Sequence, residues 1–286
     1  MAGNVQRMRA LAVCGAAALA TQAHGREMSL RAAPDGRALT LTFSDEFNHT
    51  DRSDDPSPRL WRTTFGDGHQ LGLDRRSLPT NHELEIYVDS GLSDPQGNMG
   101  LDPFRIHDGY LDITARPTPA ALVPRLRSYP YVSGLISSQP SFSQAYGYFE
   151  MRAEVPGGKG VWPAFWLLPA DQSWPPEIDV MESVGDPSVV YTAVHSTVEP
   201  AKGGTGHIAP GEFHTFAVSW DSSNVIFYAD GRQIDQEPTP PDMNKPMFML
   251  ANLAIGGDWP GAPDAATQFP VKFRIDYIRA YRFAHD

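Results

Sequence analysis

Cysteine is almost missing from this sequence, since Cys14 is the single one among 286 residues. A chain with one cysteine cannot close an internal disulfide, so a hydrophobic core must stabilise its fold. The histidines His82, His207 and His214 form no zinc-ligand pattern with a cysteine. The sequence also lacks a glycine-rich phosphate loop and a nucleotide-binding fingerprint, so we expect chemistry that requires no cofactor.

Basic residues are scarce as well. The chain has 23 lysines and arginines against 34 aspartates and glutamates, and its formal net charge is −11. Such an acidic balance argues against nucleic acid and anionic membranes as partners. After the first two dozen residues no apolar run is long enough for a transmembrane helix. We therefore expect a monomer that binds neither nucleic acid nor a membrane.

The first residues have the layout of a targeting segment. Arg7 and Arg9 precede an apolar run from Ala10 to Ala20, and Thr21-Gln22-Ala23 offers small residues for cleavage. This order is typical of a secretory signal peptide. We therefore predict a signal peptide over residues 1–23, a polar lead-in over 24–38, and export to the extracellular or periplasmic space.

From residue 39 onward, short alternating runs are separated by clusters of glycine, proline, aspartate and asparagine. This pattern predicts strands joined by turns. Asp230-Gly231 is a strong two-residue hairpin signal. No amphipathic helix of twelve residues or more is evident, so residues 39–286 are predicted to form one all-β domain, a two-sheet sandwich. The clearest runs are Leu39–Phe43, Leu84–Val88, Tyr110–Ala115, Tyr146–Val155, Phe213–Trp220, Val225–Tyr228 and Phe273–Tyr281.

One of the runs carries three acids within six residues. Because side chains alternate on a strand, Glu177 and Asp179 share one face, and strict alternation would turn Glu182 to the other face. Burying a lone carboxylate in a core is costly. One extra residue near Val180-Met181, a β-bulge, would return Glu182 to the acidic face. The segment therefore predicts a row of three carboxylates on an open sheet face.

Such a row suits glycoside hydrolysis. An acidic row is commonly just solvated, but three neighbouring carboxylates raise the pKa of at least one of them. A retaining glycosidase needs one ionised and one protonated carboxyl group. In this interpretation Glu177 is the nucleophile and Glu182 is the acid/base. Asp179 lies between them and maintains their protonation states.

The segment Glu-Ile-Asp-Val-Met-Glu resembles the catalytic strand of glycoside hydrolase family 16. It is similar to the bulged form, which is typical of the laminarinase-like, agarase and carrageenase branches. The resemblance extends from about Phe43 to Tyr281, and further segments occur in the family's order. These are Phe43–Phe47, Asn81–Tyr87, Tyr131–Ile136, Tyr146–Glu150, Trp162–Trp166, Phe213-His214 and Asn252–Gly261.

The resemblance implies a fold and a set of sugar contacts. The fold would be a β-jelly-roll sandwich of two antiparallel sheets with a concave substrate cleft. Tryptophans on strands are often core residues, but indole rings also stack on pyranose rings, and the family pattern favours the cleft. The expected substrate-binding residues are Asn81, Trp162, Trp166, Trp174, His195, Asn252 and Trp259.

The resemblance also implies a metal and a substrate class. Glu46 and Asp276 fall where many family members bind a structural calcium ion, although two ordinary polar residues explain the positions equally well. The expected activity is endo-hydrolysis of a β-1,3 or mixed β-1,3/1,4 glucan. Three alternatives stay open on the same fold: a bacterial exopolysaccharide depolymerase of the succinoglycan type, a transglycosylase, and a non-catalytic lectin, which the presence of all three acids disfavours.

Overall fold

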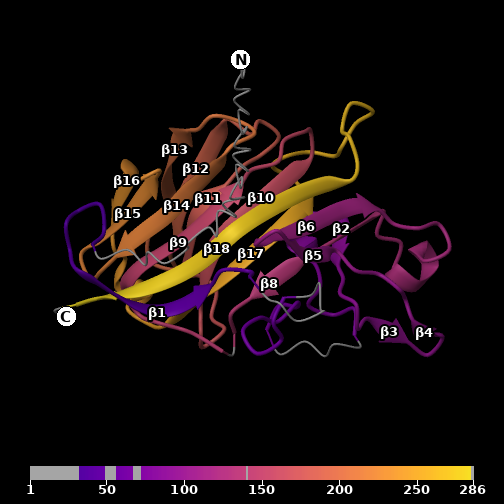
Figure 1. Ribbon diagram of the computed structural model, residues 1–286, viewed down its shortest axis with the longest axis horizontal. Coiled ribbons are helices and arrows are strands. Elements are labelled where there is room, and N and C mark those ends of the chain that lie inside the picture. Colours follow the sequence, from indigo (N-terminus) through magenta and orange to yellow (C-terminus); the bar gives the residue numbers. More distant parts are fainter. Residues whose placement is uncertain (1–31, 49–55, 67–71, 140, 285–286) are drawn as a thin grey trace, which may run out of the picture.

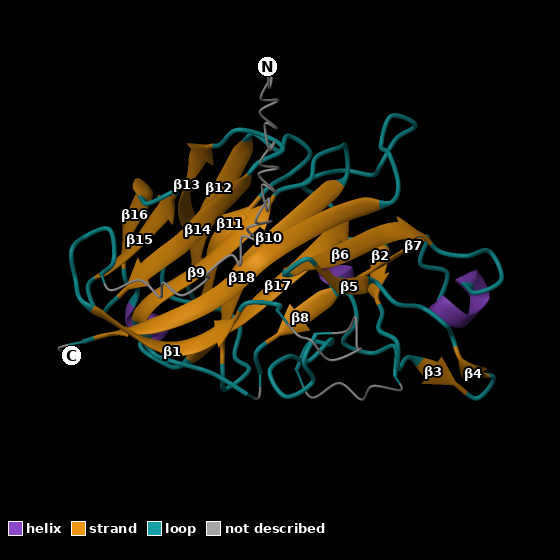
Figure 2. Ribbon diagram, in the orientation of Figure 1, coloured by secondary structure: helices purple, strands orange, loops and turns teal. Residues whose placement is uncertain are grey.

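The structure is a computed structural model that describes residues 32–48, 56–66, 72–139 and 141–284. The predicted signal peptide, residues 1–23, lies outside the described residues, as does most of the lead-in. In the described part, helix is confined to three short 3-10 turns (Figure 2). They are η1 (Pro79–Asn81), η2 (Val123–Leu126) and η3 (Pro241–Met243). No helix among the described residues is long and apolar enough to cross a membrane.

The larger of the two main sheets has ten strands. They are β1 (Leu39–Asp45), β2 (Glu85–Tyr87), β5 (Phe104–His107), β6 (Tyr110–Pro117), β7 (Tyr131–Ser133), β9 (Gly147–Glu154), β14 (Phe213–Trp220), β15 (Asn224–Ala229), β16 (Arg232–Pro238) and β18 (Val271–Phe283). The order is β16-β15-β14-β9-β18-β6-β7-β2, with β1 paired to β18 and β5 to β6. The prediction of purely antiparallel sheets is wrong at one point, because β2 and β7 pair in parallel.

The smaller sheet has six strands, all antiparallel. They are β8 (Leu135–Ser137), β10 (Val161–Pro169), β11 (Glu177–Glu182), β12 (Val189–His195), β13 (Lys202–His207) and β17 (Met247–Ile255). Their order, β13-β12-β11-β10-β17-β8, places the acidic strand β11 in the middle. A separate hairpin is formed by β3 (Ser93–Asp94) and β4 (Gly97–Asn98).

The two sheets lie one over the other (Figure 1), and the main cluster of buried side chains comes from strands of both. Alternation decides which side chains enter it: in β10, Phe165 and Leu167 are fully buried in this core, while Trp162 points to the opposite face. Each such aliphatic or aromatic side chain contributes roughly 1.5–3 kcal/mol on burial. The predicted all-β sandwich is confirmed. The face of the smaller sheet that is turned away from the core, hereafter the active face, carries the functional side chains.

The turn between β15 and β16 has the conformation that its sequence predicts. β15 and β16 are joined at Asp230 and Gly231, which have φ values of 50° and 70°. Positive φ at both central residues is what a tight hairpin turn of this kind requires, and aspartate followed by glycine adopts it at low cost. The predicted hairpin is therefore confirmed.

The two sheets also meet along one edge, at β13 and β16. A side chain at Gly204 would meet Asp235 of β16 at 2.7 Å, and one at Gly206 would meet Ile234 of β16 at 2.9 Å. Thr192 Oγ1 of β12 donates a hydrogen bond of 2.9 Å to Asp235 Oδ2 of β16. Glycines therefore let the edge of the smaller sheet approach the larger sheet, which closes the sandwich on that side.

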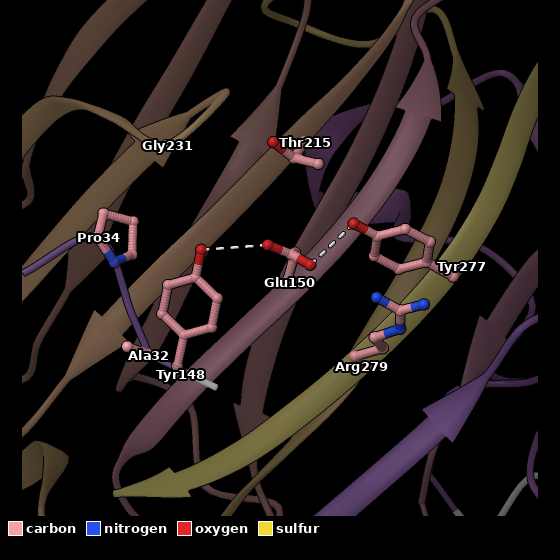
Figure 3. A pocket seen from close by; sticks show the side chains of 8 residues that line it. All are labelled: Ala32, Pro34, Tyr148, Glu150, Thr215, Gly231, Tyr277 and Arg279. Carbon is pink, nitrogen blue, oxygen red and sulfur yellow. Dashed lines mark hydrogen bonds between the residues drawn. The ribbon is translucent and has the colours of Figure 1, made fainter. Parts of the chain in front are cut away.

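The outer face of the larger sheet holds a shallow hollow over β9 and β18 (Figure 3). At its base the carboxylate of Glu150 accepts hydrogen bonds from Tyr148 OH (3.2 Å) and Tyr277 OH (2.9 Å). Burial raises the pKa of Glu150. Because both carboxylate oxygens are already hydrogen-bonded to tyrosines, the hollow is a satisfied structural network.

Candidate active site

The acidic strand contains the predicted bulge. β11 pairs with β10 as Asp179 with Trp166, then Met181 with Phe165 and Glu182 with Ala164, so Val180 has no partner. Val180 and Met181 both enter the core as a result. The extra residue restores the alternation, and Glu182 returns to the face of Glu177 and Asp179. The sequence prediction of three carboxylates on one face is confirmed.

Glu182 is held by an indole. Trp162, the neighbour from β10, donates its Nε1–H to Glu182 Oε1 at 2.8 Å. Burial raises the pKa of Glu182 to about 7; the hydrogen bond from Trp162 opposes the rise, and the negative charges of Glu177 and Glu83 add to it. A carboxyl group with such a pKa is protonated in weakly acidic solution and can act as a general acid.

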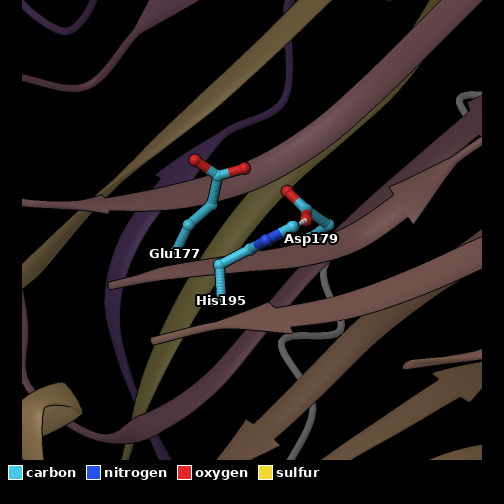
Figure 4. A group of neighbouring side chains, drawn as sticks. All are labelled: Glu177, Asp179 and His195. Carbon is cyan, nitrogen blue, oxygen red and sulfur yellow. Dashed lines mark ion pairs between the residues drawn. The ribbon is translucent and has the colours of Figure 1, made fainter. Parts of the chain in front are cut away.

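The other two acids form a compact group with a histidine (Figure 4). Glu177 lies opposite His195 in the β11–β12 pairing, and His195 Nε2 is 3.0 Å from Asp179 Oδ2. The exposed Trp174 donates its Nε1–H to Glu177 Oε2 at 2.7 Å. One ligand atom from each of Glu177, Asp179 and His195 lies within 4.8 Å of the others.

Protonation in this group is shared. Burial raises the pKa of Asp179 to about 6, and burial together with the charge of Asp179 raises the pKa of Glu177. The hydrogen bond to Asp179 raises the pKa of His195. Two adjacent buried carboxylates do not ionise together, so the pair carries one proton. When the proton of the pair lies on Asp179, Glu177 is ionised, and the Trp174 N–H stabilises its negative charge.

Aromatic side chains surround the acids on one side. The ring of Trp259 packs edge-on against Trp162 at 5.6 Å and against Tyr191 at 4.9 Å between centroids. Trp259 is 47% exposed and Trp174 is 68% exposed, as predicted for sugar-stacking residues. Sequence reasoning missed Tyr191. Its signal was available, because residues 191, 193 and 195 of β12 share the face of His195.

Two predicted sugar contacts lie deeper than expected. Trp166 occupies the active face, but only 7% of its surface is exposed, which corrects the expectation of a solvent-exposed stacking ring. It packs beneath Phe65 and Tyr87 and donates its Nε1–H to Asn252 Oδ1 at 2.7 Å. Asn252 in turn donates to Tyr87 OH at 3.0 Å. Both side chains therefore support the site from below, and sequence alternation could not reveal the layer that covers them.

Asn81 ends η1 beside the loop that follows β17. Its backbone carbonyl accepts the N–H of Asp258 at 2.9 Å, and its side-chain Nδ2 donates to Glu83 Oε1 at 2.9 Å. These bonds bring Asn81 next to the loop of Trp259, whose ring contacts Trp162, the indole that donates to Glu182. The predicted residues Asn81, Trp162 and Trp259 are thus brought together from three separate segments.

The two candidate calcium ligands are paired with cations. Glu46 binds Arg279 through both oxygens at 2.7 Å, and Asp276 Oδ2 lies 2.6 Å from Arg152 Nη1. Within the described residues these carboxylates join no group of metal-ligating side chains. Guanidinium groups pair with both oxygens of Glu46 and with one oxygen of Asp276, and oxygens paired in this way are not available as calcium ligands. The calcium site stays a prediction, and the chemistry below uses no metal.

Comparison with known proteins assigns the family. The model of Glycosyl hydrolases family 16 matches residues 102–279. This chain belongs to glycosyl hydrolase family 16. It is 39% identical to the endo-1,3-1,4-beta-glycanase EglC of Rhizobium meliloti, over 93% of this chain and 56% of that protein. It is 31% identical to the beta-glucanase of Rhodothermus marinus, over 85% of both proteins.

Solved structures agree with this assignment. The laminarinase catalytic domain of Thermotoga maritima superimposes with a TM-score of 0.69 at 31% identity, over 85% of this chain and 98% of that domain. The predicted jelly-roll architecture is therefore confirmed. The chain spans only about half the length of EglC, so the family member described here corresponds to part of that relative.

Proposed function

We propose that this protein is a retaining endo-β-glycosidase that hydrolyses internal β-1,3 or mixed β-1,3/1,4 linkages of a glucan. The observation that carries the proposal is that two acids of one strand, Glu182 and Glu177, are suited to different roles. Glu182, with its raised pKa, is suited to give a proton, and Glu177, with an indole N–H on its carboxylate, is suited to attack.

The reaction follows from these two roles. Glu177 forms a bond to the anomeric carbon while the glycosidic bond breaks, and Glu182 gives its proton to the leaving oxygen. Glu182, now ionised, then takes a proton from water. The resulting hydroxide attacks the anomeric carbon, the bond to Glu177 breaks, and the β-configuration is retained. Asp179 lies beside Glu177 and can take up the single proton of the pair, which leaves Glu177 ionised for the attack.

Names of relatives support the substrate class. The proteins compared above are called an endo-1,3-1,4-beta-glycanase, a beta-glucanase and a laminarinase. A second substrate class, bacterial exopolysaccharide of the succinoglycan type, is favoured by one feature. Trp174-Pro175-Pro176 places a largely exposed indole directly before Glu177, a segment that resembles the exopolysaccharide depolymerases of the family. Transglycosylation would use the same two acids with a sugar as acceptor.

A substrate panel separates these activities. Reducing ends would be measured over laminarin, barley mixed-linkage glucan, succinoglycan, agarose and xyloglucan, with product sizes recorded to detect transfer to sugar. Hydrolysis of laminarin or the mixed-linkage glucan is the expected outcome. Products longer than the substrate would instead establish a transglycosylase, and inertness on every polymer would overturn the proposal.

The nucleophile is tested by labelling. A fluorinated activated glycoside slows release of the covalent intermediate, so peptide mapping should find the sugar on Glu177. Glu177→Gln should fold normally and lose activity by several orders of magnitude, because no other side chain replaces the attacking carboxylate. Glu212→Gln, an identical change at an exposed position, is the matched control. A label on any other residue contradicts the assignment.

We further propose that the enzyme is exported and acts as a monomer on its polysaccharide. The support is the basic, apolar and small-residue order of residues 1–23, together with a polymer substrate that lies outside the cell. Amino-terminal sequencing of the exported protein, expected to begin near residue 24, and its mass in solution are the two measurements that check this.

A further inference from the structure

Two buried carboxylates outside the catalytic strand lie beside the site. Glu83 is 6% exposed and Glu85 is fully buried, and the two stand two residues apart, which turns them to the same side of an extended chain. Glu83 Oε1 accepts the Asn81 Nδ2–H at 2.9 Å, and Glu85 Oε2 accepts the Ile255 N–H at 2.7 Å. Their other oxygens, Glu83 Oε2 and Glu85 Oε1, are buried and meet no donor among the described residues.

A proton between the carboxyl groups satisfies both of these oxygens. Two neighbouring buried carboxylates cannot both be ionised, and each unsatisfied oxygen would be costly. Burial and the charge of Glu83 raise the pKa of Glu85 well above its ordinary value. Burial also raises the pKa of Glu83, but hydrogen bonds from Glu85 and Asn81 oppose that rise. The proton therefore stays on Glu85, and the single negative charge of the pair stays on Glu83.

The pair lies where two site-forming segments meet. Leu84, between the two acids, donates its N–H to Ile255 O at 2.7 Å and packs so closely on Gly256 that a side chain there would meet it at 2.5 Å. Gly256 begins the loop that carries Trp259. Glu83 thus holds the Asn81 side chain on one segment, while Glu85 holds the end of β17 on the other.

Further ionisable groups face the pair. Tyr87 of β2 lies next to it, and burial together with the charges of Glu85 and Glu83 raises the Tyr87 pKa. The negative charge of Glu83 also raises the pKa of Glu182 on β11. His82 and Asp258, both exposed, lie at the same junction, and His82 Nδ1 is 2.9 Å from Asp258 Oδ2.

We propose that Glu83 and Glu85 share one proton and act as a positioning pair, which joins the Asn81 turn to the Trp259 loop and keeps one negative charge beside the acid/base Glu182. Neither residue touches the reacting atoms. The inference rests on the proposed function for its kinetic consequence, but the shared proton itself is a property of the folded chain and is testable without substrate.

The infrared spectrum tests the proton directly. At pH 8.5, where Glu182 is ionised, the wild-type protein should show the C=O stretch of protonated buried carboxyl groups. Glu85→Gln should lose the part of this band that Glu85 contributes, while the part from the Glu177–Asp179 pair remains. Glu212→Gln, exposed and far along the chain, is the control and should keep the band. If Glu85→Gln retains the full wild-type band, the carboxyl pair does not hold a proton on Glu85 and the proposal fails.

The pH profile tests the effect on Glu182. In Glu85→Gln the amide still donates to an ionised Glu83, so the basic limb of kcat/KM should stay near its wild-type position. The double variant Glu83→Gln/Glu85→Gln removes the negative charge, which should move the basic limb down by about half a pH unit. An unmoved limb in a folded double variant overturns the positioning role. If no polymer is hydrolysed at all, the proposed function fails, while the infrared result still decides the shared proton.

Discussion

Glu182, the proposed acid/base, makes the stability of the fold depend on pH. Its pKa in the folded protein is about 7, above its ordinary value of 4.5, because burial disfavours the charged form. A raised folded-state pKa contributes stability that is fully present below about pH 4.5 and lost as the pH rises through 7. The ionised form of Glu182 therefore weakens the fold in alkaline solution.

Glu182→Gln should consequently stabilise the protein in a pH-dependent way. The amide keeps the shape and cannot ionise, so unfolding free energies of variant and wild type should agree at pH 4. At pH 8 the variant should be more stable by on the order of 2 kcal/mol. Urea unfolding at both values measures this, with Glu212→Gln as the control. A stability difference that is the same at both pH values would show that Glu182 does not titrate in this range.

Two tryptophans on the active face should respond in opposite ways to truncation. Trp259 is half exposed, so Trp259→Ala should leave the fold intact and weaken use of long oligosaccharides by roughly tenfold or less, since a stacked ring contributes about 1 kcal/mol. Trp166 is buried, and Trp166→Ala should destabilise the fold by about 3–5 kcal/mol. Thermal melting and oligosaccharide kinetics separate the two. If Trp259→Ala unfolds the chain instead, its ring is structural.

At the scale of the element, the bulge of β11 sets which face receives Glu182. Deleting Val180 would give a regular strand in which Glu177, Asp179 and the acid/base still alternate onto the active face. The deletion variant should fold, with a loss of roughly 1.5–3 kcal/mol for the missing core side chain. Deleting both Val180 and Met181 would instead put Glu182 directly after Asp179 and turn it toward the core, so that variant should be inactive and far less stable. Activity in the double-deletion variant, measured beside the single deletion, would contradict this register.

Much of this element could be predicted from the sequence. Strand alternation together with the cost of a buried acid was enough to place the bulge and the three carboxylates. The burial of Trp166 and the network of Asn252 could not be predicted, because Phe65 and Tyr87 cover them from distant segments. The Glu83–Glu85 pair was missed for the same reason, since alternation on one strand does not show what packs over its face.

At the scale of the whole molecule, the arrangement of the site favours internal cleavage. β11 lies in the middle of the smaller sheet, with β12 and β13 on one side and β10, β17 and β8 on the other. A long polysaccharide lying across these strands would present a mid-chain linkage to Glu177 and Glu182. The viscosity of a matched glucan should therefore fall faster than reducing ends appear. Release of monosaccharides alone from one chain end would rule out this mode.

Because β11 contributes to both the core and the active face, few changes of its sequence can be tolerated during evolution. Alternate residues of the strand fill the core or carry the reaction, so almost any substitution there endangers folding or turnover. Asn81, Trp174 and Trp259, in contrast, lie on connecting segments outside the strands. Selection for a new polysaccharide would therefore act through those segments, with the strand inherited unchanged. Directed evolution of specificity is best confined to libraries at these positions.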